Sequence, residues 1–504
     1  MIVSKSHRLS AIAAYSEPRW ISARRISSSD VLASWPEAIC VAMIRLVIVW
    51  SVISTSLSIQ VAAGGEDDMW RCGVAVKNIT PQEPMWMAGY GGRTGPATGK
   101  LSELFAKALV LEDREHNRGV ILTLDLVGID RRLSRRVATA IGERLKLPTQ
   151  NVLITTSHTH SGPVVGKNLA ALHYYQLAKS FQQQIDEYEQ ALFENCVECA
   201  VEAGSRTKPC ELAWGTGRAD FATNRRENKE ADVPNLRAAG QLKGPVDHEV
   251  PVLAARDAEG KLVAVMFGYA CHSTVLSSNL WSADYPGYAQ SELEQRHPGC
   301  VALFFAGCGA DQNPLPRRTP ELAHHYGQRL ATAVDSVLLT STMHVATPRL
   351  QCRYAEVALP LADLPTEAQL RTQQSSENRS ESTRASMLLE QIASGTPLEP
   401  TYPYPVSSWQ FGSDLQLIAL GGEVVVDYSL RIKSDLSKSD LSSTSWVAGY
   451  AHDVMAYIPS RRVLAEGGYE GGGAMVYYGL PAYWSPEIEE RIMEGVRALS
   501  QTTD

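Results

Sequence analysis

The chain has little of what marks nucleic-acid-binding or membrane-embedded proteins. Only 7% of its 504 residues are aromatic, and the formal net charge is −8, with acidic residues outnumbering Lys and Arg. A basic footprint for a polyanion is missing, so no nucleic-acid partner is expected. Without an amphipathic basic helix, at most peripheral membrane contact is expected. The remaining composition, 44% apolar and 20% charged, is typical of a globular protein.

A long apolar run stands close to the start of the chain. From Met43 the sequence reads MIRLVIVWSVIS, and small residues follow at 61–63. A short basic start, an apolar stretch and small residues are typical of a secretory signal. We therefore expect 1–42 to be a mis-called extension, translation to start at Met43, cleavage near Ala63 and export to the periplasm or medium. The alternative is an uncleaved segment that anchors the protein in a membrane.

Cysteine is scarce, and its spacing gives a weak signal. Removal of the presequence takes away Cys40 and leaves eight cysteines, a number that permits disulfides in an exported chain without fixing their pairing. Cys196 and Cys199 form a C-x-x-C, but no second C-x-x-C accompanies it. Core thiols, or a structural disulfide with a cysteine such as Cys210, are therefore favoured over a zinc knuckle or a redox pair.

Strand and helix patterns alternate along 65–504. Strand patterns cover 71–81, 104–113, 119–129, 150–160, a hairpin at 250–273 that turns at Glu259-Gly260, 300–307 and the start of 415–436. Helix patterns cover 132–145, 172–203, 287–296, 320–338 and the end of 415–436. This order predicts an α/β fold with mixed sheets and flanking helices. A polar stretch at about 364–405 is expected to be an exposed, partly helical insertion.

Ionisable residues stand at the ends of several apolar segments. His158 and His160 follow the apolar run 152–154, and strand alternation predicts that both point to one face. His272 ends the predicted hairpin, and Glu423 follows two glycines inside another apolar segment. Imidazoles and carboxylates that converge at one point are what a zinc site requires. Alternatively, the histidines are structural or exposed and Glu423 only begins a turn.

Together these segments resemble the neutral ceramidase family, zinc-dependent amidases that hydrolyse N-acylsphingosines. The resemblance covers roughly Cys72 to Tyr478. It implies His158 of HTHSGP as a zinc ligand, His272 of YACHSTVLSS as a second and Glu423 of ALGGEVVVDY as a third. The family's last ligand is a tyrosine twelve residues before another active-site tyrosine. Tyr457 and Tyr469 of YEGG match that spacing, which no generic zinc pattern would produce.

The resemblance also implies residues that handle the substrate. His160, beside the metal, would serve the reacting amide. Arg225 of FATNRRENK would stabilise the substrate carbonyl or the carboxylate product, and Tyr469 would help to hold the substrate. Zinc-bound water would attack the amide carbon. The implied function is hydrolysis of an amide in an N-acyl lipid or related N-acyl compound, by an N-acylsphingosine amidohydrolase-like enzyme.

The chain departs from the family at the position of an active-site serine. The family has Gly-Asp-x-Ser-Pro-Asn, whereas this chain has GCGADQNP. Alignment from Gly309 places Gln312 at the serine, and alignment from Asp311 places Asn313 there. Neither amide can form an acyl-enzyme, but either can donate a hydrogen bond to the substrate. The chain also ends at Asp504, so the family's C-terminal immunoglobulin-like domain is expected to be absent.

Two other readings compete with a zinc amidase. An amidohydrolase barrel also uses H-x-H after a strand, but it places this motif on its first strand and needs eight βα units. A non-catalytic zinc-stabilised binding protein would keep the ligands and lack the chemistry, in keeping with the missing serine. Measurement of turnover separates this last reading from an enzyme.

Overall fold

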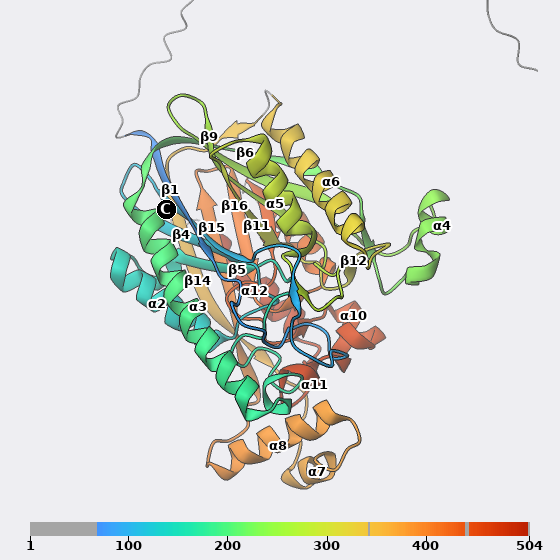
Figure 1. The fold of residues 1–504 in the computed structure, drawn as a ribbon. Coiled ribbons are helices and arrows are strands. Elements are labelled where there is room, and N and C mark those ends of the chain that lie inside the picture. Colours follow the sequence, from blue (N-terminus) through green and yellow to red (C-terminus); the bar gives the residue numbers. More distant parts are fainter. Residues whose placement is uncertain (1–67, 341–342, 439–442, 502–504) are drawn as a thin grey trace, which may run out of the picture. The chain divides into compact units, whose positions relative to one another are not determined.

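Apolar strands and amphipathic helices of the chain build two packed sheets with helices on their outer faces (Figure 1). The computed structural model describes residues 68–340, 343–438 and 443–501. The expected start, signal peptide and cleavage position lie outside the described residues and stay predictions. Within the described ranges, no helix is both long and apolar enough to cross a bilayer.

The larger sheet has nine strands and mixed direction. Its order is β11-β9-β8-β6-β1-β3-β4-β5, and β13 also pairs with β6. The pairs β4/β5 and β9/β11 are parallel, and the other pairs are antiparallel. The bounds are β1 Trp70–Asn78, β3 Phe105–Glu112, β4 Arg118–Leu124, β5 Val152–Thr156, β6 Lys208–Arg218, β8 Glu249–Arg256, β9 Leu262–Tyr269, β11 Val301–Ala306 and β13 His344–Val345.

Four long helices cover one face of this sheet (Figure 1). They are α2 Arg131–Leu145, α3 Lys179–Ser205, α5 Asp284–Arg296 and α6 Pro320–Leu338. The side chain of Asp130 accepts a hydrogen bond from the Leu133 backbone and thereby caps α2. The apolar stripe of each helix packs on the strand residues that point to this face, which are every second residue of each strand.

The other face of the nine-stranded sheet packs on a four-stranded sheet of order β14-β15-β16-β18. Its strands are β14 Leu350–Pro360, β15 Thr401–Phe411, β16 Leu415–Leu420 and β18 Thr444–Ala448. The rings of Trp409 and Trp446, both fully buried, lie in the core between the sheets. On the outer face, α9 Val426–Lys438 and α12 Ile488–Ser500 complete the layers. The mixed α/β fold is confirmed, and the amidohydrolase-barrel reading is wrong because these sheets do not close into a parallel barrel.

Short elements connect the layers and carry most of the candidate site. Among them, α7 and α8 lie in the polar stretch 364–405, but β15 already begins at 401. The short elements are β2 Gly99–Lys100, β7 Ala222–Asn224, α4 Val233–Ala238, β10 Leu280–Trp281, β12 Gln312–Pro314, α7 Glu367–Gln373, α8 Arg379–Ala393, β17 Glu423–Val424, β19 Tyr457–Ile458, α10 Arg461–Glu466, a π-helical turn Tyr469–Gly473 and α11 Met475–Tyr478.

Two sequence predictions need correction. The helix expected over 172–203 begins at Lys179, because residues 174–176 form a separate 3-10 turn. The eight cysteines of the described chain are free and buried, so a disulfide between the C-x-x-C and Cys210 is wrong, and core thiols are confirmed. Cys199 lies between β1 and β3, with Sγ 3.4 Å from the Ala75 and Ala106 carbonyl oxygens.

Candidate metal centre

The loops after β5 and β9 bring His158 and His272 together. β5 ends at Thr156, so His158 lies beyond the strand and takes a left-handed backbone with φ 57°. The strand alternation expected to align His158 and His160 is therefore not the cause of their proximity. A parallel bridge between Thr159 and Ser273 holds the loop that carries His158 and His160 beside the loop that carries His272. Left-handed backbone costs energy in a non-glycine residue and is concentrated at functional sites.

Backbone carbonyls fix the proton on each of these histidines. His158 donates from Nδ1 to the Val127 oxygen at 2.6 Å, and His272 donates from Nδ1 to the Gly309 oxygen at 2.7 Å. A carbonyl only accepts, so each Nδ1 carries a proton and each Nε2 of a neutral ring is bare. Burial, with the Arg225 charge nearby, lowers the pKa of His272 to about 4. Its Nε2 therefore offers a lone pair at neutral pH.

Glu423 completes this arrangement from the other half of the chain. β17 pairs in parallel with β19, which sets Glu423 beside Tyr457. Glu423 Oε2 lies 3.1 Å from the Nε2 atoms of both His158 and His272. It is nevertheless a buried oxygen without a hydrogen-bond partner among the described residues, because bare nitrogens donate nothing. Burial raises the pKa of Glu423, and only the protonated forms of the two imidazoles lower it well below its usual value.

These donors suit a divalent cation. A buried carboxylate facing two lone pairs is unfavourable unless a positive charge lies between them. Imidazole nitrogens and a carboxylate are common zinc ligands, and tetrahedral zinc bonds of about 2.0–2.1 Å hold their ligand atoms about 3.3 Å apart. The 3.1 Å separations are close to that spacing. The donor set of His158, His272 and Glu423 therefore fits a zinc ion.

His160 belongs to the same cluster. Its Nε2 lies 3.1 Å from Nε2 of His158, and ligand nitrogens of His158, His160 and His272 all lie within 4.8 Å of one another. Burial and the two neighbouring imidazoles lower the pKa of His160 well below its usual value. The ring also lines the cleft described below, so His160 is within reach of both a metal and a substrate.

Tyr457 lies next to His272, and Arg225 lies next to Tyr457. The hydroxyl of Tyr457 is 3.4 Å from His272 Nε2 and accepts a hydrogen bond from Arg225 Nη2 at 3.1 Å. Burial and the Glu423 charge raise the pKa of Tyr457 well above its usual value, whereas Arg225 opposes this rise. Arg225 is held in turn by Glu470, which accepts from Nε at 2.7 Å. A cation next to Tyr457 would favour the phenolate form in the same way as Arg225 does.

A cleft of about 650 Å³ opens in front of these residues. The Tyr457 and Tyr469 rings lie 5.2 Å apart, and Tyr469 is 48% exposed at the cleft. Leu315 is the one aliphatic side chain longer than alanine in the described lining, which otherwise consists mainly of charged, amide and aromatic groups. The predicted residues His158, His160, Arg225, His272, Glu423, Tyr457 and Tyr469 are thus brought together around one cleft.

Gln312 is the exception, because it does not belong to the lining of the cleft. Its side-chain oxygen accepts from the Asp247 backbone at 3.3 Å, and its nitrogen donates to the Cys308 carbonyl at 3.3 Å. The adjacent Asn313 lines the cleft and contacts Arg225. Neighbouring side chains of a strand point to opposite faces, so only one of the two can face the substrate. Of the two candidate positions, Asn313 lines the cleft, whereas the Gln312 side chain bonds to backbone groups of the interior.

Two residues of the site were missed in the sequence. Tyr478 donates a short hydrogen bond to Glu423 Oε1, the oxygen that does not face the histidines. Glu470 accepts from Arg225 and Arg226, at 2.7 Å in each case. Glu470 follows Tyr469 in the matched YEGG motif, so its position was a usable signal. Nothing in the local pattern around Tyr478 points to a contact with a residue 55 positions earlier.

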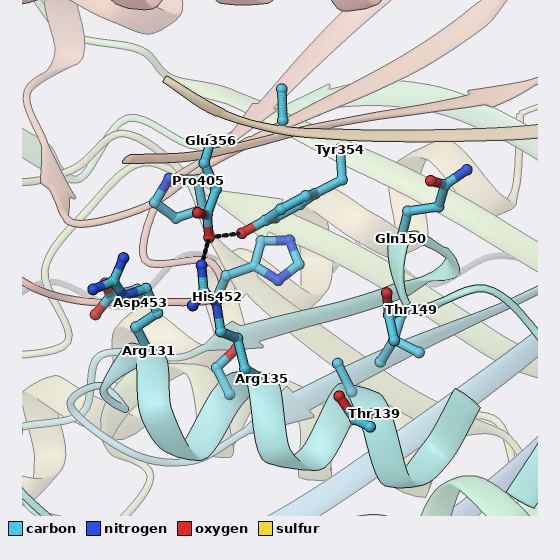
Figure 2. Close-up of a pocket in the computed structure, with 14 residues that line it drawn as sticks. Arg131, Arg135, Thr139, Thr149, Gln150, Tyr354, Glu356, Pro405, His452 and Asp453 are labelled. Atoms are coloured by element: carbon cyan, nitrogen blue, oxygen red, sulfur yellow. Dashed lines mark hydrogen bonds and ion pairs between the residues drawn. The ribbon is translucent and has the colours of Figure 1, made fainter. Parts of the chain in front are cut away.

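A second cavity, of about 470 Å³, lies between α2 and β14 (Figure 2) and shares no lining residue with the cleft. Arg131 and Arg135 reach it from α2, and Arg135 and Tyr354 both donate to Glu356 on its far wall. Asp453 lines the cavity, and its backbone oxygen accepts from the Gly422 nitrogen at 2.7 Å. The backbone next to Glu423 is therefore supported from this side.

Comparison with known proteins finds similarity to neutral ceramidases. The family model described as neutral/alkaline non-lysosomal ceramidase, N-terminal, matches residues 70–306. The chain is distantly similar to neutral ceramidases. Neutral ceramidase of Pseudomonas aeruginosa is 27% identical over 259 residues, 49% of this chain and 37% of that protein. Neutral ceramidase A of Dictyostelium discoideum is 27% identical over 240 residues, 46% of this chain and 32% of that protein. The alignments thus span about a third of the length of these relatives.

Solved structures extend the likeness of fold. The crystal structure of neutral ceramidase from Pseudomonas aeruginosa matches with a TM-score of 0.64 at 20% identity, over 85% of this chain and 73% of that one. A ceramidase complexed with C2 matches with a TM-score of 0.64 at 18% identity, over 86% and 77% of the two chains. The α/β architecture with mixed sheets is therefore that of a neutral ceramidase.

Proposed function

We propose that this protein belongs to the neutral ceramidase family and is a zinc-dependent amidase that hydrolyses an N-acyl lipid or related N-acyl compound. The observation that carries this proposal is the convergence of two bare Nε2 atoms, from His158 and His272, on the unpartnered Glu423 Oε2. The match of residues 70–306 to the ceramidase model supports amide hydrolysis at this site. We assign His158, His272, Glu423 and Tyr457 as the zinc ligands.

When bound, a zinc ion supplies Lewis-acid catalysis, polarising an amide carbonyl and lowering the pKa of water to about 7. The chain itself supplies the surroundings of the reacting amide. Arg225, fixed by Glu470, offers positive charge beside Tyr457 for the carbonyl oxygen. His160 is uncharged because burial lowers its pKa, so it can accept a proton at neutral pH. Tyr469, at the cleft, is placed to hold the substrate.

Zinc binding and hydrolysis by single variants test this assignment. The His158→Ala protein should lose stoichiometric zinc and all amide hydrolysis, because it lacks a ligand. The His160→Ala protein should keep about one zinc per chain while its kcat falls on the order of 100-fold, as for loss of a general acid or base. Zinc is measured by elemental analysis of the purified proteins, and hydrolysis is measured with N-acyl substrates from ceramides to short N-acyl amines.

The outcomes of this experiment separate the competing functions. If the wild-type protein binds one zinc and cleaves no amide in the panel, a zinc-stabilised binding protein replaces the enzyme. If zinc remains in His158→Ala at full stoichiometry, the ligand assignment is wrong. Loss of zinc from His160→Ala would instead make His160 a ligand, which its distance of 3.1 Å from His158 allows.

We also propose export to the periplasm or medium, on the strength of the apolar run that follows Met43. The expected mature N-terminus lies just after Ala63. N-terminal sequencing of the protein isolated from its host tests this cleavage. An intact N-terminus on protein that sediments with membranes would support the anchored form.

A further inference from the structure

Asn313 occupies a fixed place on the wall of the cleft. It lies in β12, which pairs antiparallel with β7 and sets Asn313 opposite Thr223. In the preceding residue, Gln312, the side-chain oxygen and nitrogen both form hydrogen bonds with buried backbone groups. Asn313 is only 4% exposed, yet it belongs to the lining of the cleft. Its side chain is therefore held in position before any substrate arrives.

The orientation of the Asn313 amide follows from its neighbour. Arg225 Nη1 lies 3.3 Å from Asn313 Oδ1. A guanidinium only donates, so the atom that faces it must be the amide oxygen, and the NH₂ group must point elsewhere. Among residues 68–340, 343–438 and 443–501, Nδ2 has no acceptor. An oriented donor without a partner thus faces the cleft.

This donor lies close to the metal ligands. Arg225 bonds through Nη1 to Asn313 and through Nη2 to the Tyr457 hydroxyl, which is itself 3.4 Å from His272 Nε2. The Arg225 guanidinium therefore lies between the Asn313 amide and the Tyr457 hydroxyl and contacts both. A substrate amide at the ligand cluster would have its carbonyl oxygen within reach of such a neutral donor. The lone pair of the amide nitrogen is delocalised into its own carbonyl group, so Asn313 can donate a hydrogen bond to the oxygen but does not act as a nucleophile.

We propose that Asn313 Nδ2 donates a hydrogen bond to the carbonyl oxygen of the scissile amide and strengthens that bond as the oxygen gains charge. This proposal rests on the proposed function, because it assigns a contact within the same reaction. Loss of one such donor lowers kcat on the order of 100-fold to 1,000-fold in other hydrolases. The alternative is that Asn313 acts only as an acceptor that positions Arg225.

Three substitutions separate these roles. Asn313→Asp keeps an oxygen for Arg225 and removes the donor, whereas Asn313→Leu removes both. Asn313→Ser retains a hydroxyl that can accept from Arg225 and donate to the substrate. For a donor, kcat on N-hexanoylsphingosine should fall on the order of 100-fold in both Asp and Leu variants, KM should rise about tenfold, and Ser should retain at least about a tenth of wild-type kcat.

Three further measurements accompany turnover. Zinc content and melting temperature show that each variant is folded and loaded, and Asn235→Asp on exposed α4 is the matched control for the amide-to-carboxylate change. Binding of N-hexanoylsphingosine to zinc-free protein is measured by calorimetry, and the Asp and Leu variants should bind about tenfold more weakly. The proposal is overturned if Asn313→Asp keeps the kcat of wild type. If wild type shows no turnover, the proposal is overturned when wild type and all Asn313 variants bind N-hexanoylsphingosine with the same Kd. Absent turnover with a preserved difference in Kd overturns only the amidase function.

Discussion

Single backbone carbonyls decide the chemistry of the two buried histidines. The carbonyl oxygens of Val127 and Gly309 each accept a hydrogen bond from the Nδ1–H of one ring, so the unprotonated Nε2 of each neutral ring faces Glu423. Metal-ligating histidines usually donate their other N–H in this way, which fixes the tautomer and the orientation of the ring. The same reasoning applies to the carboxylate, whose second oxygen accepts from Tyr478.

Tyr478→Phe should therefore weaken zinc binding without abolishing it. The change removes the donor that orients Glu423, and loss of such a partner typically lowers metal affinity 10- to 100-fold. Competition with a chelator of known affinity measures the effect. Tyr477→Phe is the control, because the neighbouring hydroxyl makes no hydrogen bond to a described residue. Equal zinc affinity of the two variants would show that the Tyr478 contact does not orient Glu423.

At the scale of elements, short segments at the ends of strands carry the site, and these were partly predictable. The histidine, Gly-Gly-Glu and Tyr-x₁₁-Tyr motifs marked the right segments because each follows an apolar strand or keeps a fixed spacing. The left-handed turn at His158 was not predictable, since it depends on the bridge from Thr159 to Ser273 across the fold. The contact of Tyr478 with Glu423 was missed for the same reason. The choice between Gln312 and Asn313 depends on a one-residue register, which only the pairing of β12 with β7 sets.

The turn before β17 depends on Gly422. Its φ is +73°, and a Cβ there would lie 2.6 Å from Ile458 Cγ1 and 2.8 Å from the Ala456 oxygen. Gly422→Ala should lower the free energy of unfolding by about 1–3 kcal/mol and displace Glu423, so zinc affinity should fall as well. Chemical denaturation and zinc titration measure the two effects.

Gly395→Ala provides the matched control for this prediction. Gly395 has a similar φ of +83°, but a Cβ there would meet nothing within 4 Å. The Gly395→Ala protein should lose only the stability that a non-glycine residue costs at positive φ, and it should keep wild-type zinc affinity. Equal losses of stability in both variants, with zinc affinity intact in both, would contradict a steric role for Gly422.

At the scale of the whole molecule, buried acids impose a pH dependence on stability, and Asp453 is the clearest case. Burial raises the pKa of Asp453 to about 7, although Tyr402 donates to the carboxylate at 2.6 Å. An unfolded Asp has a pKa of about 3.9. Between these values the unfolded chain releases a proton that the folded protein retains. This group therefore lowers stability as pH rises from about 4 to about 7, with no further change above.

Asp453→Asn should remove that slope. The variant keeps an acceptor for Tyr402 and cannot ionise, so its stability relative to wild type should rise with pH by roughly 1.4 kcal/mol per unit of the window. Unfolding by urea at several pH values measures the difference. The neighbouring His452, whose pKa burial lowers to about 4, titrates in both proteins and cancels in the comparison. Parallel stability profiles would show that the carboxyl is ionised in the folded state.

Zinc should stabilise the wild-type protein in proportion to its occupancy. A ligand present at a thousandfold excess over its Kd adds about 4 kcal/mol if it binds only the folded state. Thermal unfolding with and without zinc measures the shift in melting temperature. His158→Ala should show no such shift, and a shift of wild-type size in that variant would contradict the assigned site.

The three donors of the cluster come from two different layers of the fold. His158 and His272 follow strands of the nine-stranded sheet, whereas Glu423 follows β16 of the four-stranded sheet. The three donors meet only after the two sheets have packed through the core that contains Trp409 and Trp446. A cation bound there would cross-link parts of the chain that fold as different layers. Acquisition of zinc would then report that assembly of the two sheets is finished, before any substrate is offered.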